Sequence, residues 1–242
     1  MNFLKYILSL AALGSTLTAG HAAERRLTVS SFDEIRVEGA LSVVVKTGIG
    51  SSAIATGDAR TLDRLSLRRS DRTLIVSLKR RTNGSNHFAS DDNHGQDAIK
   101  VALSTYALSR VALIGTGDVK VDKLKASATK ILLNGAGEVV VDKVETDKFT
   151  LLSFGEGRVK VSGKTRDARV ELQGFGSFDG SELFARNLKL TQRGPARTQI
   201  NVEEKVEITN SGTGDINIIG SPTCFVKSLG SAKIVCGVKK RK

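Results

Sequence analysis

The chain has 242 residues, 40% of them hydrophobic, and a mean hydropathy of −0.10, which indicates an ordered protein and excludes an intrinsically disordered one. Aromatic residues make up only 5% and tryptophan is absent, so Val, Ile, Leu and Ala fill the core, which favours a narrow and repetitive interior. The formal net charge of +12 favours acidic partners but is equally compatible with a basic exported protein that has no specific ligand.

The first 22 residues have the features of a secretory signal peptide. Lys5 supplies a positive charge, residues 6–13 are mostly apolar, and small residues lead to Ala22, after which we expect cleavage. This apolar run is too short to span a bilayer, and no later run is long enough for a membrane helix. The sequence therefore predicts an exported protein, periplasmic, at the cell surface or secreted, with no transmembrane segment in the mature chain.

Residues 27–103 are predicted to form a β-rich N-terminal part that lacks the repeat found in the rest of the chain. Apolar residues alternate at 41–45 and at 74–78, which indicates strands. Residues 81–96 are polar and almost free of aliphatic side chains, so we expect a mobile insertion between two strands.

A glycine pair, Gly-x-Gly or a form in which the second glycine is replaced, recurs about every twenty residues within the segment 104–237. The first glycines are Gly115, Gly135, Gly155, Gly174, Gly194, Gly212 and Gly230, and the second glycines that remain are Gly117, Gly137, Gly157, Gly176 and Gly214. A fixed period of this length is typical of stacked units, none of which can bury its apolar face alone. Apolar and polar residues alternate on both sides of each pair, which indicates two strands per unit.

Each repeat is therefore predicted to consist of a strand, a glycine corner, a second strand and a polar corner. A corner where two strands meet requires positive φ or close approach of two backbones, which a Cβ atom would obstruct. We predict an all-β fold in which about seven such coils stack over residues 104–237. Residues 27–103 would cover one end, and residues 238–242 would form a basic tail at the other.

Two cysteines, Cys224 and Cys236, fall in the inward columns of the last repeat. When the repeats are aligned on their first glycine, Cys236 shares its column with Val121 and Val141, and Cys224 shares its column with Phe149. Both side chains would then point into the last coil from its two strands. In an exported protein they could form a disulfide that stabilises the end of the stack, and the alternative is two buried thiols that act as small hydrophobic side chains.

Isolated motifs in the repeats resemble nucleotide and calcium sites but fit them poorly. Gly115 and Gly117 begin a dinucleotide-binding pattern, but Lys120 stands where the third glycine is expected. Calcium-binding nonapeptide repeats carry similar glycines, but their period is nine and not twenty. His87 and His94 lie in the polar insertion with a spacing that matches no compact metal site. We therefore predict no cofactor and no metal.

An enzyme is the alternative class, because parallel β-helices also host polysaccharide lyases and hydrolases. Aligned repeats place Asp118 and Glu138 on successive coils, about 5 Å apart, which is the only acidic pair that could work as acid and base. Arg158 occupies the same position in the next repeat, so a surface ladder of ion pairs explains these residues better than catalysis.

Basic residues cluster ahead of the insertion and define a candidate patch for anionic partners: Arg60, Arg64, Arg68, Arg69, Arg72, Lys79, Arg80 and Arg81. Aromatic residues do not interleave with them, so specific nucleic acid binding is not expected. An acidic glycan, lipopolysaccharide or an anionic membrane surface suits an exported protein. A solvated basic face without a ligand is equally compatible with the pattern.

Several segments together resemble the head GIN domain family of putative auto-transporter adhesins. They are the opening segment 32–39 (FDEIRVEG), the stretch 43–46 (VVVK) that leads to 56–58 (TGD), the strand 74–76 (LIV), and the serial glycine pairs. The likeness covers roughly residues 30–237. It implies a mostly parallel, right-handed β-solenoid of the bacterial envelope, with no established catalytic residues.

We accordingly expect a non-enzymatic, adhesin-like binding or structural role. The solenoid faces and the basic patch would be presented to glycans, anionic lipid or an envelope protein, and copies of the chain could associate end to end or face to face. A carbohydrate-active enzyme on the same scaffold is the alternative.

Overall fold

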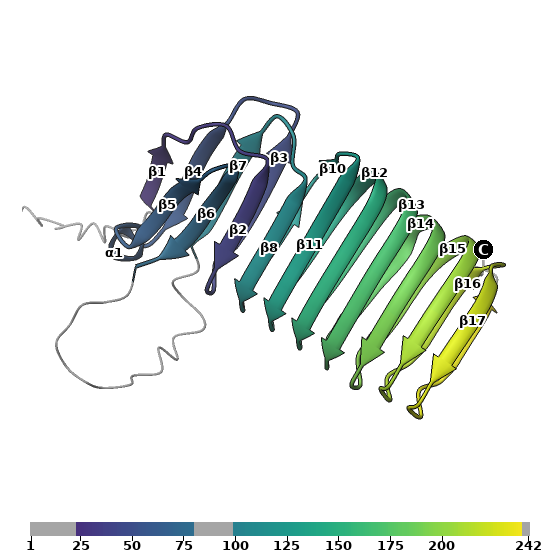
Figure 1. The fold of residues 1–242 in the computed structure, drawn as a ribbon. Helices are drawn as coiled ribbons and strands as arrows, with labels where there is room; N and C mark the ends of the chain where they lie inside the picture. Colours follow the sequence, from purple (N-terminus) through teal and green to yellow (C-terminus); the bar gives the residue numbers. More distant parts are fainter. Residues whose placement is uncertain (1–22, 80–98, 239–242) are drawn as a thin grey trace, which may run out of the picture.

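The computed structural model describes residues 23–79 and 99–238 (Figure 1). The predicted signal peptide, the predicted insertion and the basic tail from residue 239 lie outside these described residues. One short helix, α1 (Ala59–Leu62), accompanies the strands. The strands are β1 (Ala23–Leu27), β2 (Glu34–Glu38), β3 (Ser42–Thr47), β4 (Ser52–Gly57), β5 (Leu65–Ser70), β6 (Thr73–Leu78), β7 (Lys100–Thr105), β8 (Arg110–Gly115), β9 (Asp118–Val121), β10 (Leu124–Lys125), β11 (Ala128–Gly135), β12 (Glu138–Gly155), β13 (Arg158–Gly174), β14 (Ser177–Arg193), β15 (Arg197–Asn210), β16 (Ile216–Gly220), β17 (Thr223–Ser228) and β18 (Ile234–Val238).

The chain winds into a β-solenoid, and each coil adds one strand to each of two long parallel sheets (Figure 1). The first sheet runs in spatial order through β6, β2, β8, β11, the second parts of β12, β13, β14 and β15, and β17. The second sheet runs through β7, β3, β9, the first parts of β12 to β15, β16 and β18. The predicted all-β fold of stacked coils is therefore confirmed.

The solenoid begins earlier in the chain than the glycine repeat predicts. Strands β2 and β3 pair in parallel with β8 and β9, and Gly39, with φ of +96°, lies at the corner between them. Residues 34–47 thus form a coil of their own, although Leu41 stands where a second glycine would be. Strands β6 and β7 pair with the other side of this coil, so its neighbours in space are separated from it along the chain. Because the chain forms other strands between these neighbouring coils, the twenty-residue spacing of the repeat does not appear in this part of the sequence.

Antiparallel strands form the cap at this end. Strand β5 pairs with β6, while β4 pairs with both β7 and β1. Asp58 caps helix α1 by accepting a hydrogen bond from the Thr61 backbone N–H at 3.1 Å, and Leu62 packs into the core at 2% exposure.

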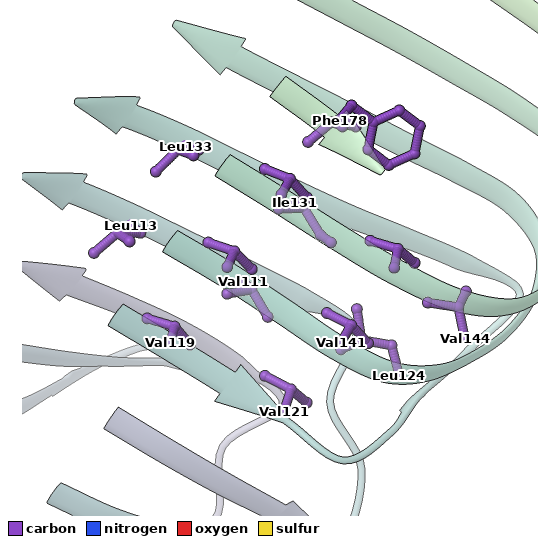
Figure 2. Packing of buried hydrophobic residues seen from close by; sticks show 14 of the residues in the cluster. Val111, Leu113, Val119, Val121, Leu124, Ile131, Leu133, Val141, Val144 and Phe178 are labelled. Carbon is purple, nitrogen blue, oxygen red and sulfur yellow. The ribbon is translucent and has the colours of Figure 1, made fainter. Parts of the chain in front are cut away.

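Aliphatic columns fill the interior of the solenoid, as the alternating pattern predicts. Figure 2 shows Val111 and Ile131, which lie in register on the neighbouring strands β8 and β11, with Val119 and Val121 facing them from the second sheet. These four side chains are at most 1% exposed. Phe149 and Phe178 are the largest buried side chains, and their rings stack with centroids 6.5 Å apart. Burial of these aliphatic rows is the main source of stability, because each coil covers its neighbour.

The glycine corners lie where successive coils approach most closely. Five of the first glycines have positive φ: Gly115, Gly135, Gly155, Gly174 and Gly194. The largest of these angles is +135°, at Gly135. The carbonyl oxygens of Gly115, Gly135 and Gly155 each accept two hydrogen bonds from the next coil, as when Gly155 accepts from the N–H groups of Phe175 and Gly176 at 2.9 and 3.0 Å. A Cβ atom on Gly157 would lie 2.6 Å from the Gly137 carbonyl oxygen. The second glycine is therefore required by close approach, and the first by both φ and approach.

Polar side chains replace leucine in one buried column, in the coils where the glycine pairs begin to lose their second glycine. The column contains Leu172, then Gln192 and Asn210, both fully buried. The Gln192 amide donates to the carbonyls of Ala196 and Gly214 at 2.7 and 2.8 Å and accepts from the Thr198 hydroxyl at 2.7 Å. These bonds satisfy backbone carbonyls at two successive corners, the first of which has Ala196 in place of a second glycine.

Cys224 and Cys236 form a disulfide in the last coil, with Cα atoms 6.7 Å apart. Cys224 is in register with Val206 and Cys236 with Ile218, which are the inward columns that the repeat alignment assigns to them. The bond ties β17 to β18 across the last described coil. Among residues 23–79 and 99–238, no helix is long and apolar enough to cross a membrane.

Candidate binding groove

An open groove of about 1190 Å³ runs across the coils on the short side of the solenoid, where the chain passes from the second sheet back to the first. Its side chains stack one above another because the strands are in parallel register: Lys125 aligns with Glu145, Glu145 with Lys164, and Lys164 with Phe184. Neighbouring side chains are thus spaced by the roughly 4.8 Å between strands. The lining residues are Lys125, Ala126, Ser127, Glu145, Thr146, Asp147, Lys164, Thr165, Arg166, Phe184, Arg186 and Glu203.

Glu145 is the most strongly perturbed acid of the groove. Its carboxylate lies 2.7 Å from the Lys143 ammonium and 2.9 Å from that of Lys123, with Lys125 at 4.0 Å. Hydrogen bonds from Lys143 and Lys123 lower the pKa of Glu145 from 4.5 to about 2. The group is therefore ionised at neutral pH.

Arginines pair with the other acids along the same side. Arg166 lies 3.8 Å from Asp147 and 3.2 Å from Asp167, and Arg186 lies 3.4 Å from Glu204. Because these pairs are exposed to solvent, each contributes little to stability, but together they hold long side chains in place along the groove.

An exposed aromatic ring and two threonines complete the groove. Phe184 is 41% exposed, which leaves one apolar surface between the charged pairs. The Thr146 hydroxyl donates to the Ser127 and Lys148 carbonyls at 3.2 and 3.1 Å, and Thr165 does the same with Asp147 and Asp167. These bonds fix both hydroxyls at a corner of the coil.

A second hollow of about 490 Å³ lies on the residues that directly follow the groove in each coil, such as Lys148 and Asp167. Asp167 accepts a hydrogen bond from the Asn187 amide at 2.9 Å, and this bond, together with Arg166, lowers the pKa of Asp167. Glu207 lies 2.7 Å from the Lys205 ammonium, which likewise lowers the pKa of Glu207. Both hollows therefore present ionised, paired groups.

This chemistry suits binding better than proton transfer. A general acid must hold its proton near neutral pH, which requires a raised carboxyl pKa. In the groove and the second hollow the shifted carboxyl groups, Glu145, Asp167 and Glu207, are all held below their ordinary pKa by neighbouring donors. Alternating donors and acceptors beside an exposed ring are instead the groups that bind a hydroxyl-rich chain.

The acidic pair of the alternative enzyme hypothesis lies elsewhere. Asp118 and Glu138 are adjacent in register on the second sheet, as expected, but neither lines the groove or the second hollow. Arg158 lies in the next coil with its Nε atom 3.5 Å from Glu138. Within residues 23–79 and 99–238, no three His, Cys, Asp or Glu side chains gather closely enough to hold a metal ion.

The basic patch forms part of the N-terminal cap, on α1, β5 and the turn before β6. Arg72 forms two hydrogen bonds with Asp33, and this pairing lowers the pKa of the carboxyl group. Arg64 and Arg69 donate to the carbonyls of Lys79 and Asp71.

The remaining patch residues are less constrained or lie outside the described chain. Arg60 is 3.9 Å from Asp58, with its side chain 89% exposed. Arg68 lies on the exposed end of strand β5. Arg80 and Arg81 lie outside the described residues. Six of the eight predicted residues are thus placed at one end of the solenoid, and part of their charge is neutralised.

Sequence reasoning missed the groove itself. Its residues follow the second strand of each repeat, where the sequence indicates only polar corners. The register also shifts there, between Val141 and Val144 and between Gly180 and Phe184. Phe184 is an aromatic residue within such a corner, and that is the one signal that could have marked the position.

Comparison with known proteins identifies the family of the chain and its fold. The sequence profile of a family described as "Putative auto-transporter adhesin, head GIN domain" matches residues 31–222. No curated protein has a sequence that matches the chain.

Three solved structures share its fold at low identity. A putative adhesin from Bacteroides fragilis is 21% identical, with a TM-score of 0.71, over 91% of this chain and 97% of its own. A putative lipid binding protein from Parabacteroides distasonis is 16% identical, with a TM-score of 0.64, over 89% and 96%. A putative adhesin from Parabacteroides merdae is 17% identical, with a TM-score of 0.63, over 89% and 96%.

Proposed function

This chain belongs to the head GIN domain family of putative auto-transporter adhesins, and from that premise we propose that it is an exported, non-enzymatic binding protein of the bacterial envelope whose groove holds a glycan chain. The family and its neighbours support an adhesin-like role in general terms. The glycan, the groove and export through a signal peptide are our additions.

The observation that carries the proposal is the composition of the groove. It is open and long enough to cross several coils, and paired charges alternate along it. Phe184 exposes a ring in the fourth of the five coils that line the groove. Sugar rings offer hydroxyl groups for such donors and acceptors and an apolar face for such a ring, so an extended oligosaccharide matches the groove along its length.

Rigid coils favour this use of the groove. Glu145, Lys164, Thr165 and Phe184 lie in parallel strands that are paired with a neighbouring strand on both sides. A ligand therefore meets side chains that are already in position, which reduces the entropy lost on binding. The basic patch on the cap would add long-range attraction for ligands with acidic groups.

The test is binding to a glycan array by the wild type and by the variant Phe184→Ser. We expect a retained glycan whose affinity falls about tenfold in the variant, because truncation of an aromatic residue that anchors a ligand typically costs more than 1 kcal/mol. Phe175→Ser is the matched control, because Phe175 is also exposed, at 70%, but lies at a glycine corner away from the groove.

Two results would reject the proposal. One is a wild type that retains no glycan at low ionic strength. The other is a glycan that binds both variants as strongly as it binds the wild type, since the contact would then lie outside the groove.

A further inference from the structure

The last coil exposes three large apolar side chains, one of which occupies a position that the preceding coils bury. Val226 is 48% exposed, although it is in register with Ile208, at 2%, and through it with Leu190, at 0%. Phe225 is 56% exposed and Leu229 is 84% exposed, and both belong to the same segment, residues 225–229. We call residues 223–234, from the start of β17 to the start of β18, the tip (Figure 1).

The charged residues within the tip are both lysines. Residues 216–242 contain six Lys or Arg residues and no Asp or Glu. Of these, Lys227 and Lys233 lie within the tip and are exposed. The nearest acid in register is Glu207, which lies opposite Phe225 on the neighbouring strand. The Lys205 ammonium lies 2.7 Å from the Glu207 carboxylate and neutralises it. The same ammonium lies 5.5 Å from the centre of the Phe225 ring.

We propose that the tip docks the solenoid end-on to an anionic lipid bilayer, with Phe225, Val226 and Leu229 in the headgroup region and Lys227 and Lys233 against lipid phosphates. Exposed apolar side chains surrounded by lysines are the combination that binds peripheral proteins to anionic membranes. This site lies apart from the glycan groove, and its test is independent of it.

A protein partner covers the tip less completely. A strand added to the edge of β17 would bury Val226, but Phe225 lies on the outer face of the sheet and Leu229 lies at the corner, so both would stay exposed. A second copy of the chain would bring two basic tips together, or a basic tip against the arginines of β5 on the cap. A lipid surface is the occupant that surrounds the tip on all sides and complements its charge.

The disulfide supports this role because it makes the tip rigid. Cys224 lies directly before Phe225, and its bond to Cys236 fixes β17 against β18. A rigid tip can insert its apolar side chains without first ordering the segment, which increases the affinity for the surface.

The test is cosedimentation of the purified protein, with its disulfide intact, with vesicles of phosphatidylcholine that contain 30% phosphatidylglycerol or none. We expect binding to the anionic vesicles alone, weakening as salt screens the lysines. Leu229→Ser should reduce partitioning into the anionic vesicles at least tenfold, because the free energy gained by burying the leucine side chain in the membrane is lost. Lys227→Ser combined with Lys233→Ser should reduce it about 25-fold, at roughly fivefold for each charge.

Matched controls separate the tip from the rest of the surface. Phe175→Ser removes an apolar side chain that is 70% exposed at the corner of an earlier coil, and Lys100→Ser combined with Lys160→Ser removes two exposed lysines from the second sheet. Both should change partitioning less than twofold. Arg68→Ser combined with Arg69→Ser removes two basic residues at the opposite end and should likewise change partitioning less than twofold. Circular dichroism confirms that each variant is folded.

Four outcomes would overturn the proposal. The first is equal sedimentation with both kinds of vesicle, and the second is binding that the tip variants leave unchanged. The third is a dimer of the free protein that Leu229→Ser dissociates, which would make the tip an interface between copies. The fourth is a protein that ignores vesicles but binds polyglutamate through Lys227 and Lys233, which would assign the tip to an acidic polypeptide.

Discussion

Replacement of a corner glycine by alanine tests how tightly the coils are stacked, and Gly155→Ala is the most informative change. Gly155 has φ of +110°, and a Cβ atom there would lie 2.5 Å from the Gly135 carbonyl oxygen and 3.1 Å from its carbon. Both contacts are with the backbone of the neighbouring coil, so no side chain can move aside. The variant therefore combines backbone strain with crowding.

The two costs can be estimated separately and checked at other glycines. A non-glycine residue at such a φ costs about 1–3 kcal/mol, and an overpacked core costs about 1–3 kcal/mol. The lower entropy of the unfolded chain with alanine returns about 0.4–1 kcal/mol. We expect Gly155→Ala to lower the free energy of unfolding by about 1–5.5 kcal/mol.

Three control variants isolate each cost. Gly48→Ala adds strain alone, because φ is +87° and nothing lies within 4 Å of the new Cβ. Gly157→Ala adds crowding alone, with the Leu133 Cδ2 atom 2.5 Å away and no positive φ. Gly50→Ala adds neither, since its nearest atom is the Tyr106 hydroxyl at 3.7 Å, so its stability should stay within about 0.5 kcal/mol of the wild type.

Urea unfolding followed by far-ultraviolet circular dichroism measures all four variants. The account requires Gly155→Ala to be the least stable of them and Gly50→Ala to be neutral. A loss below about 1 kcal/mol at Gly155, or the same loss at Gly50 and Gly155, would refute the argument that coil stacking dictates glycine at the corners.

Four further predictions concern single features of the molecule. Reduction of the Cys224–Cys236 disulfide should destabilise the last coil by about 3 kcal/mol, seen as earlier unfolding in thermal melts with reductant; unchanged melts would mean that the bond constrains nothing. Gln192→Leu should cost about 2–4 kcal/mol in urea unfolding, since it leaves two carbonyls and a hydroxyl without their buried partner; a neutral result would show that water reaches them. The ionised carboxylate of Glu145, with a folded pKa of about 2 against 4.5, adds a small stability above about pH 4.5 that is lost as the pH falls towards 2, so the melting temperatures of the wild type and Glu145→Gln should differ at pH 6 and converge near pH 2; a constant difference would contradict the pairing. The N-terminal sequence of the protein from an envelope fraction should begin at Ala23, and a retained first segment would contradict cleavage.

The sequence was sufficient for the parallel register of the glycine repeats. The columns that contain Val111 and Val119 follow from the alternation of apolar residues around each glycine pair. The inward positions of Cys224 and Cys236 follow from the same columns, but those positions suit two buried thiols as well as the disulfide that the structure contains. Each of these inferences depends on a short-range pattern repeated many times, so chance matches average out.

What the sequence could not provide depends on contacts between distant segments. The coil of residues 34–47 has one corner glycine, Gly39, and lies between β6 and β8 because the chain returns to it after a long excursion. The groove arises from side chains that align only after the register shifts at the short side, which no repeat period indicates. Gln192 would be judged a solvent-facing residue by its type, because its buried partners become visible only once the coils are stacked.

The central claim is that this solenoid binds a glycan in its groove and leaves it intact. The most direct measurement is to saturate the protein with a glycan retained on the array, incubate the complex, and determine the mass of the released ligand by mass spectrometry. The account predicts a ligand of unchanged mass, bound by the wild type and about tenfold more weakly by Phe184→Ser. Shortened or unsaturated products that disappear when Asp118 and Glu138 are replaced by Asn and Gln would contradict it and establish a carbohydrate-active enzyme.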